Sequence, residues 1–251
     1  MSGLLKGKVA IITGASRGIG AQAARALAAE GAAVALAARS EEALSALAEE
    51  ILATGAFCMA APTDVGDPDQ VEQLVERVVS TFGRLDIAFN NAGEGHMPAP
   101  LAELSVDSFD RAARGSLRGV FLAMKYEIPA MLVSGGGAIV NMSSTAGLQG
   151  VRGMSAYAAA KHGVIGLTES AALDYAARGV RVNAIAPGPI LTERLAALND
   201  EQRAPVARSV PMARIGQPQE VAALVAWLLS EQASFITGAT IPIDGGRLAG
   251  A

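Results

Sequence analysis

Three side chains between residues 143 and 161 have the types and spacing for chemistry on a carbonyl group. Tyr157 and Lys161 lie four positions apart, so on a helix they share one face, and Ser143 precedes them. Because an ammonium group favours a neighbouring phenolate, we expect the pKa of Tyr157 to fall below its usual value of about 10. Such a tyrosine can donate a proton to a forming alkoxide or remove one from an alcohol. The alternative is an ordinary pair on a helix surface, which only the rest of the chain can exclude.

Apolar runs typical of strands alternate with helical patterns along the whole chain. We predict strands at 9–13, 33–38, 56–62, 85–90, 138–143, 181–186 and 239–244. Two of the amphipathic stretches between them are long, at 105–132 and 155–179. Apolar strands separated by helices indicate a parallel sheet covered on both faces. With right-handed crossovers, this predicts an α/β doubly wound fold that forms a single domain over residues 1–251.

The segment at about 187–217 breaks this alternation. It contains several prolines and is longer than an ordinary connection in an α/β protein. It also follows the carboxyl end of a predicted strand, where ligands bind in such sheets. We therefore predict a flap over the site, the alternative being a disordered surface insertion.

Composition and charge exclude several classes of partner. The net charge is −4 and the lysines and arginines are scattered, which argues against binding to nucleic acid. The apolar run at 221–229 is far shorter than the ~20 residues of a spanning helix, and the N-terminus has no separate apolar segment with a cleavage site. We therefore expect a cytoplasmic protein with no nucleic-acid and no membrane partner. His96 and His162 have no metal-ligand spacing around them, so no metal site is expected.

A glycine-rich turn follows the first predicted strand. The stretch TGASRGIG at 13–20 places Gly14, Gly18 and Gly20 where the chain passes from strand to helix. Glycines there permit a close approach of a pyrophosphate, whose charge is stabilised by the free N–H groups of the helix N-terminus. In a chain of alternating strands and helices, this position predicts a dinucleotide site.

The end of the second predicted strand indicates which dinucleotide binds. An acidic residue there binds the 2′-hydroxyl of NAD, whereas an arginine accommodates the 2′-phosphate of NADP. This chain has Ala38 at that place, followed by Arg39, and Arg17 in the glycine turn can close on the same phosphate. The bidentate fit of arginine to phosphate favours NADP(H). The alternative is that both arginines are solvated surface charges, with Glu41 and Glu42 partly neutralising Arg39.

Five motifs stand in order along the chain: TGASRGIG (13–20), NNAG (90–93), Ser143, Tyr157 with Lys161, and PGPILT (187–192). Together they resemble the short-chain dehydrogenase/reductase family, and the resemblance covers essentially the whole chain. It implies a Rossmann-type sheet of seven parallel strands with helices on both faces, usually assembled as a homotetramer through the two long helices. The activity that it implies is hydride transfer between a nicotinamide cofactor and a carbonyl or secondary alcohol.

The resemblance also implies roles for individual residues. Ser143 would hydrogen-bond the substrate oxygen, Tyr157 would act as acid or base, and Lys161 would hold the nicotinamide ribose and lower the pKa of the tyrosine. The expected cofactor-binding residues are Gly14, Ser16, Arg17, Gly18, Ile19, Gly20, Arg39, Asp64, Val65, Asn91, Ala92, Gly93, Tyr157, Lys161, Pro187, Gly188, Ile190 and Thr192.

The chain departs from the family pattern at one position. The family has a catalytic asparagine in a pattern resembling N-L-x-G-x-F on the long helix before the fifth strand, and this chain has Ser116 at that place. Serine is shorter and lacks an amide group. We therefore expect an active enzyme with a weakened water relay and a slower turnover.

Three functional hypotheses follow. The first is an NADP(H)-dependent carbonyl reductase or alcohol dehydrogenase for a small to medium substrate. The second is a 3-oxoacyl-acyl-carrier-protein reductase. It is less favoured because the stretch 129–139 lacks the basic residues that would bind an acidic carrier protein, and Arg178 alone is weak support for such binding. The third is a catalytically impaired NADP-binding regulator or scaffold. The expected substrate-pocket residues are Ser143, Glu94, His96, Met97, Thr145, Leu148, Met154, Ile190, Leu191 and Leu195.

Overall fold

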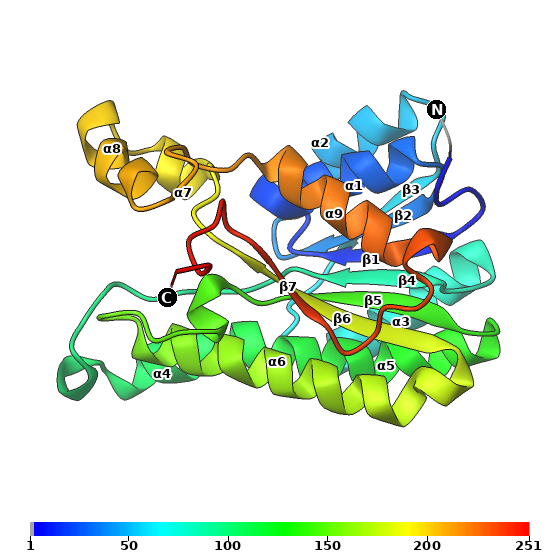
Figure 1. Ribbon diagram of the computed structural model, residues 1–251. Coiled ribbons are helices and arrows are strands. Elements are labelled where there is room, and N and C mark those ends of the chain that lie inside the picture. Colours follow the sequence, from blue (N-terminus) through cyan, green and yellow to red (C-terminus); the bar gives the residue numbers. More distant parts are fainter. Residues whose placement is uncertain (1–2, 251) are drawn as a thin grey trace.

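Seven parallel strands form one sheet in the computed structural model, which describes residues 3–250 (Figure 1). The strand order is β3-β2-β1-β4-β5-β6-β7, so the order reverses between β1 and β4. The strands are β1 (Val9–Thr13), β2 (Ala33–Ala38), β3 (Cys58–Pro62), β4 (Ile87–Asn90), β5 (Gly137–Met142), β6 (Val180–Pro187) and β7 (Thr240–Ile243). The predicted Rossmann-type fold class is confirmed, and each predicted strand boundary lies within two residues of the observed one.

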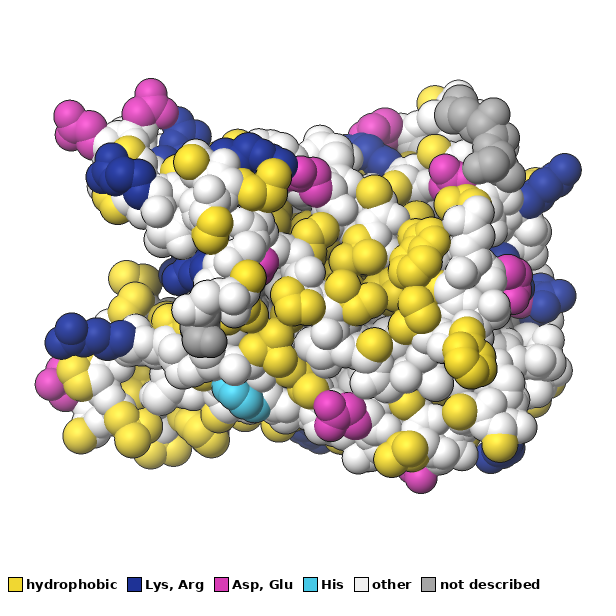
Figure 2. Space-filling model, in the orientation of Figure 1, with side chains coloured by type: hydrophobic (Ala, Val, Ile, Leu, Met, Phe, Trp, Pro, Cys, Tyr) yellow, Lys and Arg dark blue, Asp and Glu magenta, His cyan; other side chains and the backbone are white. Residues whose placement is uncertain are grey.

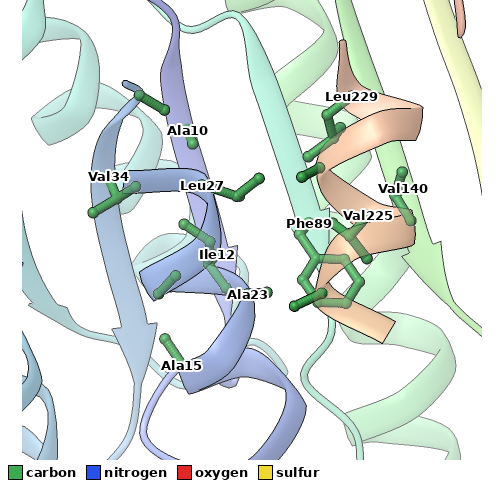
Figure 3. Close-up of a cluster of buried hydrophobic side chains, with 14 of the residues drawn as sticks. Ala10, Ile12, Ala15, Ala23, Leu27, Val34, Phe89, Val140, Val225 and Leu229 are labelled. Carbon is green, nitrogen blue, oxygen red and sulfur yellow. The ribbon is translucent and has the colours of Figure 1, made fainter. Parts of the chain in front are cut away.

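Helices cover both faces of the sheet (Figure 1). One face carries α1 (Gly18–Ala29), α2 (Glu41–Leu52) and α9 (Pro218–Leu229), and the other carries α3 (Pro68–Phe82), α5 (Gly119–Val133) and α6 (Ser155–Tyr175). Figure 3 shows the core of the first face, where Ala23 and Leu27 of α1 lie near Val225 and Leu229 of α9 above Phe89 of β4. Small alanines let α1 approach the sheet closely. None of the helices formed by residues 3–250 has the length and apolarity needed to span a bilayer.

Three short helical segments lie at the carboxyl edge of the sheet. The helix α4 (Val106–Ala113) continues through a π-helical turn at Arg114–Arg118 into α5, so the long helix predicted at 105–132 is interrupted by a turn of wider spacing. The segment predicted as a flap forms α7 (Glu193–Ala196) and α8 (Asp200–Arg208), which project beyond the sheet. Figure 2 shows the surface hollowed between this projection and the region of α4.

A buried carboxyl group joins the central strands to the helices beneath them. Glu127 of α5 is 1% exposed and accepts a hydrogen bond from Asn90 Nδ2 of β4 at 3.0 Å. The same amide donates to Asn141 Oδ1 of β5 at 3.1 Å, and Asn141 Nδ2 donates to Thr168 Oγ1 of α6 at 2.9 Å. Burial raises the pKa of Glu127 to about 7, and the hydrogen bond from Asn90 opposes this rise.

We expect Glu127→Gln to stabilise the protein at alkaline pH. The pKa of Glu127 is about 7 in the folded protein and lies above the ordinary value of 4.5. The contribution of Glu127 to the free energy of unfolding is therefore fully present below pH 4.5 and is lost as the pH rises through about 7. The loss is on the order of 3 kcal/mol, and glutamine avoids it by staying neutral. Urea denaturation at about pH 5.5 and pH 8.5 measures the effect, and the advantage of the variant should grow with pH. A difference that does not change with pH would contradict this assignment.

Candidate active site

The predicted site residues meet at the carboxyl edge of the sheet. Gly14 follows β1, Asn91 follows β4, Ser143 follows β5 and Gly188 follows β6. Positions far apart in sequence are thus brought to one edge, next to the point between β1 and β4 where the strand order reverses. In open α/β sheets this is where the ligand binds.

The glycine turn is packed too closely for side chains. Gly14 has a φ of +65°, and a Cβ on it would lie 2.7 Å from Asn91 Nδ2. A Cβ on Gly20 would overlap the carbonyl oxygen of Gly14. Asn91 Nδ2 holds the turn by donating to the carbonyl oxygens of Thr13 at 3.0 Å and Gly14 at 3.1 Å. The absence of side chains leaves the main chain at the start of α1 accessible to a phosphate group.

A cavity of about 1000 Å³ opens beside this turn. Twelve of the predicted cofactor residues line it: Gly14, Ser16, Arg17, Gly18, Ile19, Arg39, Asp64, Val65, Asn91, Ala92, Gly93 and Thr192. Its walls do not include Gly20, Tyr157, Lys161, Pro187, Gly188 and Ile190. The volume is at the upper end of those found for small-molecule pockets, as an extended ligand requires.

Five arginines and three carboxylates line this cavity. Arg114 Nη1 pairs with Asp64 Oδ2 at 2.9 Å, and Arg39 Nη2 lies 3.9 Å from Glu94 Oε2. The excess of positive charge suits a ligand with several phosphate groups. Glu94, which was expected in the substrate pocket, lines this cavity with its carboxylate opposite Arg39, and its contact with a substrate stays a prediction.

The predicted flap contributes a carboxylate to the glycine turn. Glu193, the first residue of α7, accepts a hydrogen bond from the backbone N–H of Gly18 at 3.0 Å. The preceding Thr192 touches the same glycine, because a Cβ on Gly18 would lie 3.2 Å from Thr192 Cγ2. The carboxylate therefore uses an N–H group of the turn that would otherwise be free to bind a phosphate.

We expect Glu193→Gln to tighten binding of a dinucleotide about 3- to 10-fold, because it removes a negative charge from the position of the phosphate. Fluorescence titration with NADPH and with NADH measures the dissociation constants. Glu201→Gln changes an exposed carboxylate of α8 and is the control, with an expected affinity equal to that of the wild type. An E193Q variant with wild-type affinity would show that this carboxylate does not compete with the ligand.

Tyr157 and Lys161 both belong to α6 and lie one turn apart, as their spacing predicts. Lys161 Nζ is 5.7 Å from the centre of the Tyr157 ring and donates to the Met142 carbonyl oxygen at 2.7 Å. The expected fall in the pKa of Tyr157 is not found. Burial raises the pKa of Tyr157. A hydrogen bond with Ser144 and the positive charge of Arg194 lower this pKa, but their effect is smaller than that of burial. Burial also lowers the pKa of Lys161, to about 8, because a charged ammonium is poorly solvated there.

The serine that faces the tyrosine is Ser144, and the prediction of Ser143 is corrected. Ser143 is 1% exposed, and its hydroxyl donates to the main-chain carbonyl of Lys161 at 2.9 Å, so it joins β5 to α6. The Ser144 hydroxyl accepts a hydrogen bond from the Ala146 N–H at 3.1 Å, and Ser144 is the serine close enough to Tyr157 to favour its phenolate form. Consecutive side chains leaving a strand point to opposite sides, so only one serine of the pair can face the site. The pair is visible in the sequence, but the position of α6 decides between its members.

Ser116, at the position of the family's asparagine, is fully buried in the π-helical turn. Its hydroxyl accepts a hydrogen bond from the Glu94 N–H at 3.0 Å and donates to the Glu94 carbonyl oxygen at 3.0 Å. A Cβ on Gly93 would lie 3.2 Å from Ser116 Oγ and 3.3 Å from Lys161 Nζ, so the serine and the lysine flank the same glycine. Ser116 therefore fixes the main chain after the NNAG motif, and its effect on turnover stays a prediction.

Known proteins resemble this chain over nearly its whole length. Residues 14–247 match the family model described as Enoyl-(Acyl carrier protein) reductase. The chain is 44% identical to the cyclohexanol dehydrogenase of Acinetobacter sp., with 98% of this chain and 96% of that protein covered. It is 43% identical to the 3-oxoacyl-acyl-carrier-protein reductase of Staphylococcus aureus, with 95% and 97% covered. The crystal structure of levodione reductase matches with a TM-score of 0.94 at 38% identity, covering 98% of this chain and 100% of that chain. This chain belongs to the short-chain dehydrogenase/reductase family.

A short-chain dehydrogenase/reductase works with a nicotinamide dinucleotide, NAD or NADP, on CH–OH groups. The described residues fit such a cofactor in three ways. The turn at Gly14 is free of side chains, the cavity beside it is large, and the walls carry more arginines than carboxylates.

The other predicted substrate residues of this dehydrogenase/reductase lie in different environments. Met154 precedes α6. A Cβ on Gly95 would lie 3.9 Å from Met154 Cε and 3.8 Å from Tyr157 Cδ2. Their roles in binding a substrate stay predictions. Thr145, His96 and Ile190 are buried, Leu191 and Leu195 are half-buried, and Leu148 and Met97 are exposed.

Sequence reasoning missed part of the cavity wall. Arg111 and Arg114 come from α4 and the π-helical turn, where the sequence shows an ordinary amphipathic helix. Ser40 and Glu193 directly follow the predicted residues Arg39 and Thr192, and this adjacency is a signal that could have found them. The residues missed are Ala38, Ser40, Thr63, Arg111, Arg114, Gly115, Glu193 and Arg194.

Proposed function

We propose that this short-chain dehydrogenase/reductase transfers hydride between NADP(H) and a carbonyl or secondary alcohol of a small to medium substrate. The observation that carries the proposal is that Tyr157, with Ser144 close enough to affect its pKa, lies at the edge of the sheet that also holds the arginine-lined cavity. The names of two similar proteins, a cyclohexanol dehydrogenase and a levodione reductase, support an alcohol or a ketone as the substrate.

The protein's part in the reaction is to orient the substrate and to move one proton. A bound nicotinamide supplies or accepts the hydride. Burial raises the pKa of Tyr157, so the phenol keeps its proton near neutral pH and can give it to the oxygen of a reduced carbonyl. The Ser144 hydroxyl donates a hydrogen bond to the same oxygen and so orients the substrate. Lys161, one turn further along α6, would hold the ribose of the bound nicotinamide with its ammonium group. In alcohol oxidation the deprotonated Tyr157 takes the proton.

Arg39 supports NADP(H) over NAD(H). It follows β2 and lines the cavity together with Arg17, and no acidic residue stands at the end of that strand. We expect Arg39→Ala to weaken NADPH binding about 30-fold while changing NADH binding no more than about 2-fold, because only NADPH carries the 2′-phosphate. Fluorescence titration of both cofactors measures this, with the exposed Arg208→Ala of α8 as the control. Equal weakening of both cofactors would refute the preference for NADP(H), and Glu94 opposite Arg39 would then be a reason to test NADH as the natural cofactor.

A panel of carbonyl compounds tests the proposed reaction. Purified protein and NADPH are mixed with a cyclic ketone, an aldehyde and an acetoacetyl thioester carried either by coenzyme A or by acyl carrier protein. Strong preference for the carrier-bound thioester would favour the 3-oxoacyl-acyl-carrier-protein reductase, which the Staphylococcus aureus relative supports. Binding of NADPH without consumption of any carbonyl compound would favour the regulator or scaffold.

We also propose that the chain assembles as a homotetramer through the face formed by α4, α5 and α6. This face exposes apolar side chains that a monomer would leave in water, namely Val106, Phe109, Phe121 and Leu173. Burying them between copies would remove this cost. Sedimentation equilibrium of the wild type and of Phe121→Asp tests the assembly, which the aspartate should dissociate.

A further inference from the structure

Arg194 of the short helix α7 lies close to the tyrosine that moves the proton. A Cβ on Gly95 would lie 3.6 Å from Arg194 Nη1, 3.8 Å from Tyr157 Cδ2 and 3.9 Å from Met154 Cε. Arg194 of α7, Tyr157 of α6 and Met154 of the preceding loop therefore surround Gly95. Because glycine has no side chain, space remains between these three groups. The electrostatics agree with this proximity, because the positive charge of Arg194 opposes the rise that burial causes in the pKa of Tyr157.

The guanidinium group of Arg194 has no partner among residues 3–250, where it forms no ion pair and no side-chain hydrogen bond. Two other arginines of the same cavity do have carboxylate partners, since Arg39 faces Glu94 and Arg114 faces Asp64. The neighbouring Glu193 points away from Arg194, to the N–H of Gly18. Arg194 is exposed, so its five N–H donors are solvated and can turn to an anion that binds in the cavity.

The position of Arg194 separates it from the arginines that suit the phosphates of a dinucleotide. Arg17 belongs to the glycine turn and Arg39 to the end of β2. Arg194 instead lies near Tyr157, beside which the substrate oxygen must bind for proton transfer. Met154 supplies an apolar group beside Gly95, and the half-buried Leu191 and Leu195 belong to the same segment as Arg194.

We infer that Arg194 binds a carboxylate of the substrate, so that the preferred substrates are oxo acids and hydroxy acids with an apolar carbon skeleton. The planar guanidinium can donate two parallel hydrogen bonds to one carboxylate, which fixes the orientation of the substrate as well as its affinity. Met154 and the two leucines would contact the carbon skeleton, and Ser144 and Tyr157 would hold the carbonyl oxygen. This inference rests on the proposed function, because it assigns the substrate class of the same site.

Reduction of a matched pair of ketones by NADPH tests the inference. 4-Oxocyclohexanecarboxylate carries the anion, and its methyl ester has nearly the same shape without the charge. We expect the wild type to prefer the acid by at least about 30-fold in kcat/KM, and Arg194→Met to lower the ratio of acid to ester by about 100-fold. Arg194→Lys keeps the charge but loses the bidentate geometry, so its ratio should lie between those of the wild type and R194M. Arg208→Met on α8 removes an exposed charge from the same segment and should keep the wild-type ratio.

The alternatives give different results. A wild type that reduces acid and ester equally well, or a ratio that R194M leaves unchanged, would overturn the inference while leaving the proposed reaction intact. A weaker affinity of R194M for NADPH in direct titration, with an unchanged ratio, would assign the arginine to the cofactor instead. Failure of the wild type to reduce the acid, the ester and every compound of the carbonyl panel would refute the proposed function itself.

Discussion

Tyr157→Phe is expected to lower kcat for ketone reduction about 1000-fold, because it removes the hydroxyl that donates the proton. Burial raises the pKa of Tyr157, so its hydroxyl carries a proton near neutral pH, and Ser144 lies close enough to affect that pKa. Phenylalanine keeps the ring, so the packing against Gly95 and Met154 should persist. The measurements are single-turnover reduction with saturating NADPH and titration of NADPH affinity, which should change no more than about 2-fold.

The two directions of the reaction should respond differently to pH. Burial raises the pKa of Tyr157, so the phenol stays protonated through the neutral range and reduction should not depend on pH there. Alcohol oxidation needs the phenolate and should accelerate as the pH rises toward that pKa. Loss of this acceleration in Y157F would identify the group that titrates. A Y157F variant with turnover close to that of the wild type would refute the assignment of Tyr157 as the proton donor.

Ser144→Ala is expected to lower kcat/KM about 100-fold, and Ser143→Ala to leave kcat/KM within about 3-fold of the wild type. The reason is geometric, since the Ser144 hydroxyl meets the Tyr157 phenol whereas the Ser143 hydroxyl is spent on the carbonyl of Lys161. Ser143→Ala should instead lower the free energy of unfolding by about 1 kcal/mol, because a buried hydrogen bond between β5 and α6 is lost. Steady-state kinetics and urea denaturation of both variants measure the two effects.

These neighbouring variants control for each other, because they remove the same atom one residue apart. The assignment of Ser144 fails if S143A loses the activity and S144A keeps it. It also fails if both variants lose activity in proportion to their loss of stability, because the effect of each would then be structural.

The strands could be predicted from the sequence because most of their residues are buried. All five residues of β1 are buried, and β5 and β6 are almost wholly buried, so each is a short run made mostly of apolar residues. The buried polar exceptions, such as Asn141 and Asn183, have hydrogen-bond partners. The π-helical turn at Arg114–Arg118 could not be predicted in this way. The turn contains Ser116, whose hydroxyl bonds to the main chain of Glu94, and such a contact between residues distant in the sequence leaves no local pattern.

By itself, the sequence determined the fold class, the glycine turn that follows β1 and the shared helix face of Tyr157 and Lys161, because these depend on local periodicity and on residues close together in the chain. The tertiary structure decided which serine faces the tyrosine, the sign of the shift in the Tyr157 pKa and the place of Glu94 opposite Arg39. It also brought Arg194 next to Tyr157. Each of these depends on burial or on the distance between separate elements, and a helix or strand pattern specifies neither.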